Sequence, residues 1–198
     1  MKKQSDKINE PRAGTKALAW VFKNRLTKDF HLAVDGGACV GEWTLMLAKA
    51  FKHVYAFEPV QESRAIWHKN VGVLPNVRMF PDALLDTNAR AEVYKPDGRK
   101  SLGKRQVRTS KAGPVNGIAL DSMNIPRCGL LKLDLEGCEI PALRGARETV
   151  ARCRPVLIVE FNPLFVRHGS MEELHALVTG MNYRHVHTEL VDRVYVPA

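Results

Sequence analysis

The chain has 198 residues, of which 45% are hydrophobic and 26% are charged. That length suits one domain with a sizeable core, and the balance is typical of a globular protein rather than a disordered or fibrous one. A count of 30 Lys and Arg against 21 Asp and Glu gives a net charge of +9, which favours a nucleic acid, an anionic membrane surface or an acidic small molecule as partner. We expect a single domain over residues 15–198 behind a flexible arm over residues 1–14.

The sequence favours a cytoplasmic setting. No apolar run approaches membrane-spanning length, and the opening MKKQSDKINE has no apolar segment behind its lysines. The four cysteines show neither a C-x-x-C pair nor the spacing of a disulfide framework or a zinc site, so we expect reduced thiols. They are Cys39, Cys128, Cys138 and Cys153.

Apolar runs alternate with helical patterns in the order that a parallel sheet requires. Leu18, Val21 and Leu26 recur at helical spacing, which predicts a helix after residue 15. The segments YRHVH and DRVYV predict a closing hairpin at 183–196. Between them we expect strands at 32–35, 54–57, 77–80, 130–134 and 156–161, and helices at 41–51, 61–71, 139–152 and 170–180.

A basic segment separates the two halves of this pattern. Residues 95–111 read KPDGRKSLGKRQVRTSK and carry most of the net positive charge. We predict a loop or hairpin insertion there. It would serve either as a clamp for an anionic substrate or only as a solvated hairpin, and composition does not choose between the two.

A glycine-rich turn follows the first expected strand. The stretch at 34–44 reads VDGGACVGEWT, with Asp35 ahead of the glycines, and Glu58 ends the second strand 23 positions later. Such a turn lets backbone amides approach a ligand, and an acid at the second strand end can hold the two hydroxyls of a ribose. NAD and S-adenosylmethionine both contain that ribose.

Two features of the turn favour S-adenosylmethionine over a phosphate ligand. An anionic Asp35 at the mouth of the turn would repel a pyrophosphate but would suit an ammonium and a sulfonium. The dinucleotide fingerprint G-x-G-x-x-G needs glycine where Ala38 stands, and the lysine and hydroxyl of a Walker A loop are missing after Gly41. A tight turn without any ligand remains the structural alternative.

Three motifs resemble those of the FkbM-type class I methyltransferases. The stretch AVDGGACVGEWT is similar to that family's first motif, I-D-V-G-A-N-I-G-E-Y-T, and FEP at 57–59 is similar to its second. LLKLDLEGCEIPALRGA at 130–146 resembles the signature K-I-D-V-E-G-x-E-x-x-V-L-x-G-A. The resemblance implies an α/β Rossmann-like fold: a mostly parallel seven-stranded sheet with helices on both faces and a C-terminal antiparallel hairpin.

The same resemblance implies which residues bind S-adenosylmethionine. Asp35, Gly37 and Gly41 would line its methionine moiety. Glu58 would hold the ribose, and Asp82 would reach the adenine amine or instead cap a turn. The chain departs from the family at Cys39, usually Asn, and at Gly36, usually an apolar residue. The remaining expected contacts are Gly36, Ala38, Cys39, Pro59, Ala83 and Asp134.

The candidate catalytic carboxylates follow the fourth and fifth parallel strands, where a substrate meets the cofactor in an open α/β sheet. They are Asp134, Glu136 and Glu160, and Asp134 is the best placed general base. Glu136 could instead stabilise the next helix, as could Glu139. A divalent cation held by Asp134, Glu160 and Asn162 is the less favoured alternative, and His168 is a further candidate base.

The predicted reaction is O-methylation of a hydroxyl on a small molecule, sugar or glycan, and the basic segment would suit an anionic acceptor. One rival is an RNA or DNA methyltransferase that uses the basic segment. The D/N-P-P-Y/F motif of amino-group methylation is absent after the fourth strand, although NPLF at 162–165 is superficially similar. Other rivals are a binding module without turnover and an NAD enzyme.

Overall fold

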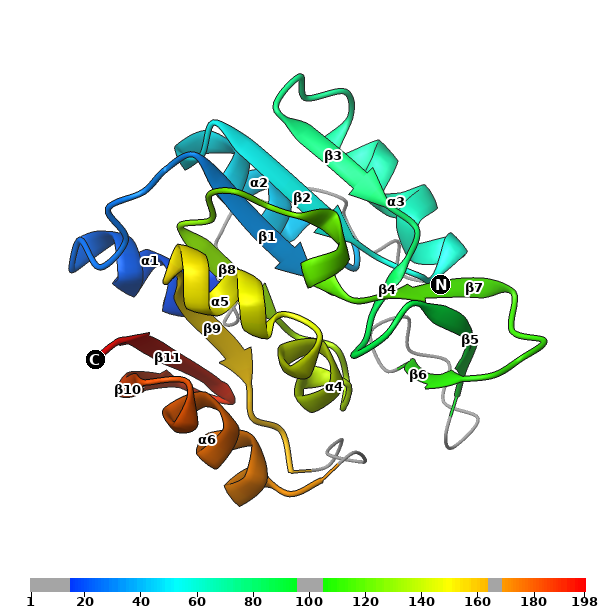
Figure 1. The fold of residues 1–198 in the computed structure, drawn as a ribbon. Helices are drawn as coiled ribbons and strands as arrows, with labels where there is room; N and C mark the ends of the chain where they lie inside the picture. The colour runs from blue at the N-terminus through cyan, green and yellow to red at the C-terminus, as the bar shows by residue number, and fades with distance from the viewer. Residues whose placement is uncertain (1–14, 96–104, 164–168) are drawn as a thin grey trace.

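A computed structural model describes residues 15–95, 105–163 and 169–198 of the chain (Figure 1). The expected arm at 1–14 and His168 lie outside the described residues, as do residues 96–104 of the basic segment. The first half of the fold contains α1 (Lys16–Lys23), β1 (Leu32–Gly36), α2 (Glu42–Ala50), β2 (His53–Phe57), α3 (Gln61–Val71) and β3 (Val77–Phe80). The second half contains β8 (Leu130–Leu133), α4 (Glu139–Arg144), α5 (Arg147–Cys153), β9 (Val156–Glu160), α6 (Met171–Gly180), β10 (Tyr183–Glu189) and β11 (Asp192–Pro197).

These strands form one seven-stranded sheet in the order β10-β11-β9-β8-β1-β2-β3. The neighbours from β9 to β3 pair in parallel. By contrast, β11 runs antiparallel to both β9 and β10. The predicted Rossmann-like sheet with a closing antiparallel hairpin is therefore confirmed. The carboxyl ends of the parallel strands lie along a single edge, where the glycine turn and the acidic motifs follow them.

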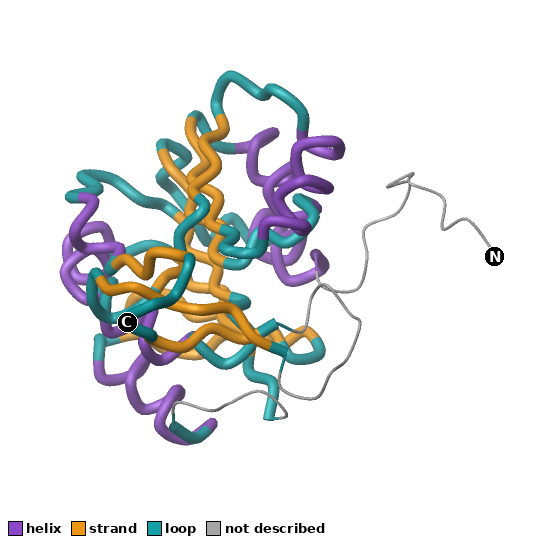
Figure 2. Tube along the Cα trace, turned by 90° about the vertical axis from the view of Figure 1, so that its right-hand side faces the viewer, coloured by secondary structure: helices purple, strands orange, loops and turns teal. Residues whose placement is uncertain are grey.

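Helices cover both faces of the sheet, as Figure 2 shows, and two cores result. On one face, Leu131 and Leu157 pack against α4, α5 and α6. The short 3-10 helix η2 (Leu120–Met123) packs on the same face. Leu130 and Ile158 pack on the other face against α1 and α2. A central parallel strand must be apolar on both sides, which is why LLKL and VLIVE read as continuous apolar runs.

The helix expected at 139–152 is two helices, α4 and α5, so this expectation is wrong. The break falls at Gly145, whose carbonyl accepts a hydrogen bond from the Asp121 amide at 2.9 Å. A Cβ at Gly145 would lie 2.0 Å from the carbonyl oxygen of Leu85, so the glycine permits this close approach. The Asp121 carboxylate then accepts from the amides of Glu148 and Thr149 at 3.0 and 2.8 Å, which begins α5.

A second, four-stranded sheet was not predicted. It contains β4 (Ala83–Leu84), β5 (Ala89–Tyr94), β6 (Gln106–Thr109) and β7 (Val115–Ile118), in the order β4-β7-β5-β6. The antiparallel strands β5 and β6 flank the centre of the basic segment. None of the helices in the described ranges is long and apolar enough to cross a membrane.

The cap on α5 gives a first testable prediction. Replacing Asp121 with alanine leaves the amides of Glu148 and Thr149 without their acceptor, and should lower the free energy of unfolding by about 1–2 kcal/mol. Urea denaturation measures the change, with Asp86→Ala as control because Asp86 is exposed. Equal stability of the two variants would show that Asp121 does not hold α5.

Candidate cofactor and acceptor site

A cavity of about 240 Å³ lies at the carboxyl ends of β1, β2 and β8. The glycine turn and the loops after β2, β3 and β8 contribute to its wall, and the small sheet closes one side. The lining residues are Gly37, Cys39, Phe57, Glu58, Pro59, Val60, Asp82, Ala83, Leu84, Arg105, Val107, Asp134, Leu135, Glu136 and Cys138.

Most of the residues that the sequence assigned to the cofactor line this cavity. They come from four separate segments: Gly37 and Cys39 from the turn, Glu58 and Pro59 after β2, Asp82 and Ala83 after β3, and Asp134 after β8. The remaining assigned residues, Asp35, Gly36, Ala38 and Gly41, belong to the same turn but do not line the cavity.

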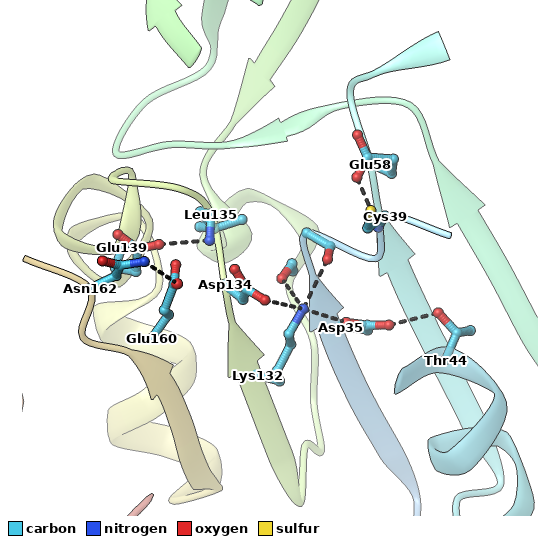
Figure 3. Close-up of polar contacts among 12 residues, drawn as sticks. Asp35, Cys39, Thr44, Glu58, Lys132, Asp134, Leu135, Glu139, Glu160 and Asn162 are labelled. Carbon is cyan, nitrogen blue, oxygen red and sulfur yellow. Dashed lines mark hydrogen bonds and ion pairs between the residues drawn. The ribbon is translucent and has the colours of Figure 1, made fainter. Parts of the chain in front are cut away.

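The side chain of Lys132 binds the backbone of the glycine turn. Its side chain is only 2% exposed, and its Nζ donates to the carbonyl oxygens of Gly36 and Gly37 at 3.0 and 2.9 Å. The same ammonium lies 3.1 Å from Asp35 Oδ1 and 3.8 Å from Asp134 Oδ2 (Figure 3). Burial alone would lower the pKa of Lys132, but the two carboxylates raise it above its ordinary value, so the group stays charged. The sequence analysis did not identify this lysine.

Asp35 is fully buried and lies below the turn rather than at its mouth. One carboxylate oxygen pairs with Lys132, and the other accepts from the Thr44 hydroxyl at 2.6 Å. That hydroxyl in turn accepts from Trp67 Nε1 at 3.0 Å. Its charge is therefore balanced inside the protein, and the expectation that Asp35 faces the ligand does not agree with this placement.

Glu58 joins the second strand to the glycine turn. Its Oε2 accepts from the Cys39 amide at 2.9 Å and its Oε1 from the Val60 amide at 2.7 Å. The side chain is almost fully buried, and burial raises its pKa, whereas the two amide donors act in the opposite direction. A carboxylate oxygen has more than one acceptor site, so each oxygen can still accept a hydroxyl from the cavity.

Three residues of the turn have positive φ angles, and two of these, Gly37 and Cys39, line the cavity. Gly37 has φ of 77°, and a Cβ there would lie 1.9 Å from the Asp134 carbonyl oxygen. Cys39 has φ of 46°, a region that disfavours most side chains. Burial and the nearby Glu58 raise the pKa of the Cys39 thiol to about 11, so it stays protonated and is no nucleophile at neutral pH.

The small sheet supplies a wall that the sequence did not predict. Val107 of β6 lines the cavity together with Arg105, which immediately precedes that strand. The guanidinium of Arg105 forms a bidentate pair with Glu62 of α3, at 2.9 and 3.2 Å. This pair joins the small sheet to the helix that follows Glu58. The segment 95–111 was expected to be either an anion clamp or a solvated hairpin. Among its described residues, 95 and 105–111, the cation that lines the cavity, Arg105, is paired with a carboxylate.

Acidic side chains gather after β8 and β9 (Figure 3). Asp134 is partly exposed, with 38% of its side-chain surface accessible, and lines the cavity together with Glu136. Glu139 accepts from the Leu135 amide at 2.6 Å, which supports the structural alternative for this residue. Glu160 lies beside them outside the cavity lining. No set of three or more His, Cys, Asp or Glu in the described ranges is arranged to hold a metal ion.

Glu160 is protonated at neutral pH. Burial, followed by the negative charges of Asp134, Glu139 and Glu136, raises the pKa of Glu160 to about 9. Its Oε1 accepts from the side-chain Nδ2 of Asn162 at 3.1 Å. At neutral pH the Glu160 carboxyl therefore carries a proton, which suits a hydrogen-bond donor. Asp134 remains the better candidate for a general base.

The motifs and the cavity agree with a comparison to known domains. The Methyltransferase FkbM domain matches residues 35–185, most of the chain. The chain belongs to the FkbM methyltransferase family. Its fold and family are those of S-adenosylmethionine-dependent methyltransferases, as the resemblance implied. A search of curated proteins finds no match to this family member.

Solved structures share the fold at low sequence identity. The FkbM methyltransferase of Methylobacillus flagellatus KT superposes with a TM-score of 0.58 and 15% identity, over 85% of this chain and 43% of that one. The magnesium protoporphyrin IX methyltransferase of Synechocystis PCC 6803 with bound S-adenosylmethionine superposes with a TM-score of 0.55 and 10% identity, over 98% of this chain and 86% of that one. A putative RNA methyltransferase from Pyrococcus horikoshii superposes with a TM-score of 0.53 and 12% identity, over 98% of this chain and 92% of that one. This family member thus spans less than half of the Methylobacillus protein.

The raised pKa of Glu160 predicts how stability depends on pH. Between its ordinary pKa of 4.5 and about 9, the folded protein holds a proton on Glu160 that the unfolded chain releases, so this group makes stability fall as pH rises through that window. Urea denaturation at pH 5, 7 and 9 should show that the free energy of unfolding falls less with rising pH in Glu160→Gln than in the unmodified protein. Glu148→Gln, at an exposed position of α5, is the control. An unchanged pH dependence in Glu160→Gln would contradict the assignment.

Proposed function

We propose that this family member transfers the methyl group of S-adenosylmethionine to a hydroxyl on a small molecule, sugar or glycan. The observation that carries the proposal is one cavity in which Glu58, held by the Cys39 and Val60 amides, and Asp134, next to Lys132, both take part. Glu58 suits the binding of a ribose, and Asp134 suits the removal of a proton from the nucleophile.

The residues of the cavity fit the cofactor. Gly37 keeps the turn free of a side chain where Asp134 approaches, and Glu58 retains acceptor capacity for ribose hydroxyls. Asp82 also lines the cavity, and Asn116 donates to its Oδ1 at 3.3 Å, so among the described residues its other oxygen can accept from an adenine amine. When bound, the cofactor supplies an electrophilic methyl group on a sulfonium.

The protein's part in the reaction is positioning and proton removal. Aligning an acceptor hydroxyl with the methyl group supplies much of the rate in such a displacement. Asp134 would take the hydroxyl proton, and its Oδ2 lies 3.8 Å from the Lys132 ammonium. Glu136 lines the same end of the cavity and would contact the acceptor.

The rival proposal, an RNA methyltransferase, has two supports. The fold is shared with the putative RNA methyltransferase of Pyrococcus horikoshii, and β6 carries Arg108 beside the cavity wall. Arg108 is itself paired with Glu92 at 2.5 Å, and Arg105 with Glu62, so these described cations are neutralised. We therefore prefer the small acceptor. A cytoplasmic setting is part of the proposal, supported by four free cysteines.

Calorimetry tests the cofactor. S-adenosylhomocysteine should bind and NAD should not, and Glu58→Ala should abolish binding because the ribose acceptor and the support of the Cys39 amide are lost together. Glu148→Ala, exposed on α5, should bind normally. Tight NAD binding would overturn the proposal in favour of a dinucleotide enzyme.

Radiolabelled methyl transfer tests turnover and separates the two acceptor classes. Labelled S-adenosylmethionine should mark a nuclease-resistant fraction of cell extract. Asp134→Asn should reduce labelling by about 10²–10⁴-fold, the usual contribution of a general base, and still bind S-adenosylhomocysteine. Label confined to nuclease-sensitive material would favour the RNA or DNA alternative. Binding without any labelling would favour a module without turnover.

A further inference from the structure

A row of polar side chains crosses four adjacent strands at the carboxyl edge of the large sheet. Asp35 of β1 pairs in register with Lys132 of β8, and Glu160 of β9 pairs with Asp192 of β11. Asp134 follows β8 directly, next to Glu160 in the register. Directly opposite residues project from the same face of a sheet. The alternation of the strands places all five on the face that α1 and α2 cover.

Asp192 is the member of this row that the account of methyl transfer does not use. It begins β11 and is 7% exposed, yet its carboxylate has no hydrogen-bond or ion-pair partner among residues 15–95, 105–163 and 169–198. Burial, followed by the negative charges of Asp134 and Glu189, raises its pKa to about 7, and the Lys132 ammonium acts in the opposite direction. Buried carboxylates are normally paired, so an unpaired one near Asp134 offers an acceptor to a ligand that enters beside that residue.

The charges of the row do not balance. Its one cation, Lys132, pairs with Asp35 and lies 3.8 Å from Asp134, so Glu160 and Asp192 have no ion-pair partner among the described residues. This excess of acidic groups occurs in a chain whose overall charge is +9. A cation beside these carboxyl groups would stabilise their ionised forms, a neutral group would not, and an anion would destabilise them.

We propose that Asp192, together with Glu160 and Asp134, forms an acceptor subsite for a positively charged amino group. The molecule that receives the methyl group then carries an ammonium close to its reacting hydroxyl. This inference rests on the proposed function, because that function places the acceptor beside Asp134. It also reverses the expectation of an anionic acceptor at this end of the site.

Protons and the ammonium compete for the same carboxylates. Burial and the neighbouring negative charges raise the pKa values of Glu160 and Asp192, so these acids hold protons near neutral pH. An ammonium that enters the row displaces those protons into solvent. Binding of a cation should therefore release protons, a signature that an ordinary polar contact does not produce.

Three small probes of matched size test the subsite on the full chain with bound S-adenosylhomocysteine. They are ethanolamine, which is cationic at neutral pH, neutral ethylene glycol and anionic glycolate. Ethanolamine should shift the amide NMR signals of Asp134, Asn162 and Asp192 at lower concentration than ethylene glycol does, and glycolate should leave them unchanged. Calorimetry in two buffers of different ionisation enthalpy should detect proton release with ethanolamine only.

Asp192→Asn removes the charge and keeps the shape, and should weaken ethanolamine binding about tenfold, as the loss of a partly buried charge partner does. Asp86→Asn, an exposed change of the same chemistry, should have no effect. Ethanolamine binding no tighter than ethylene glycol would overturn the inference, as would equal binding by the two variants. Should Asp192→Asn not fold, the three probes on the unmodified protein decide the question. Failure of S-adenosylhomocysteine to bind would count instead against the proposed function.

Discussion

The buried ammonium of Lys132 is the interaction on which the site depends. It joins the carbonyl oxygens of Gly36 and Gly37, the Asp35 carboxylate and, at longer range, Asp134. Removing a charged amine from water costs several kcal/mol, and here that cost is offset because four oxygens surround the group. The same contacts fix the glycine turn to β8, so the cofactor end and the acceptor end of the cavity share one anchor.

Around this anchor, burial divides the acidic residues into different roles. Asp35 is fully buried and paired with Lys132, a placement that suits support of the glycine turn. Glu58 is buried but faces the cavity with acceptor capacity left, which suits ribose binding. Asp134 stays partly exposed near the ammonium, whereas Glu160 lies in the crowded acidic group and holds a proton. Similar side chains thus differ in function because their surroundings differ.

The sequence was sufficient for the large sheet and for the location of the cavity. The alternation of apolar runs and helices predicted the parallel strands, and Glu58 and Asp134 could be placed because both follow such strands. The small sheet was missed because its strands are short and its core depends on contacts with Cys138 and Leu135, far away in the chain. The break at Gly145 was missed because it depends on the distant Asp121.

Lys132 and Asp192 show a second limit of sequence reasoning. Both lie in stretches that read as ordinary strands, and neither has a local pattern that marks it as part of a site. Their roles come from register: Lys132 is opposite Asp35, and Asp192 is opposite Glu160. A carboxylate or an amine acquires such a role only when the sheet sets its neighbours, which periodicity alone does not specify.

The most direct measurement of this account is the affinity of S-adenosylhomocysteine for the double variant Lys132→Met/Asp35→Asn. The double change removes the buried ion pair without stranding either charge, so the protein should still unfold cooperatively. Loss of the donor to the Gly36 and Gly37 carbonyls should nevertheless weaken binding about tenfold or more, as expected when buried acceptors lose their partner. A folded double variant that binds S-adenosylhomocysteine as tightly as the unmodified chain would contradict the account.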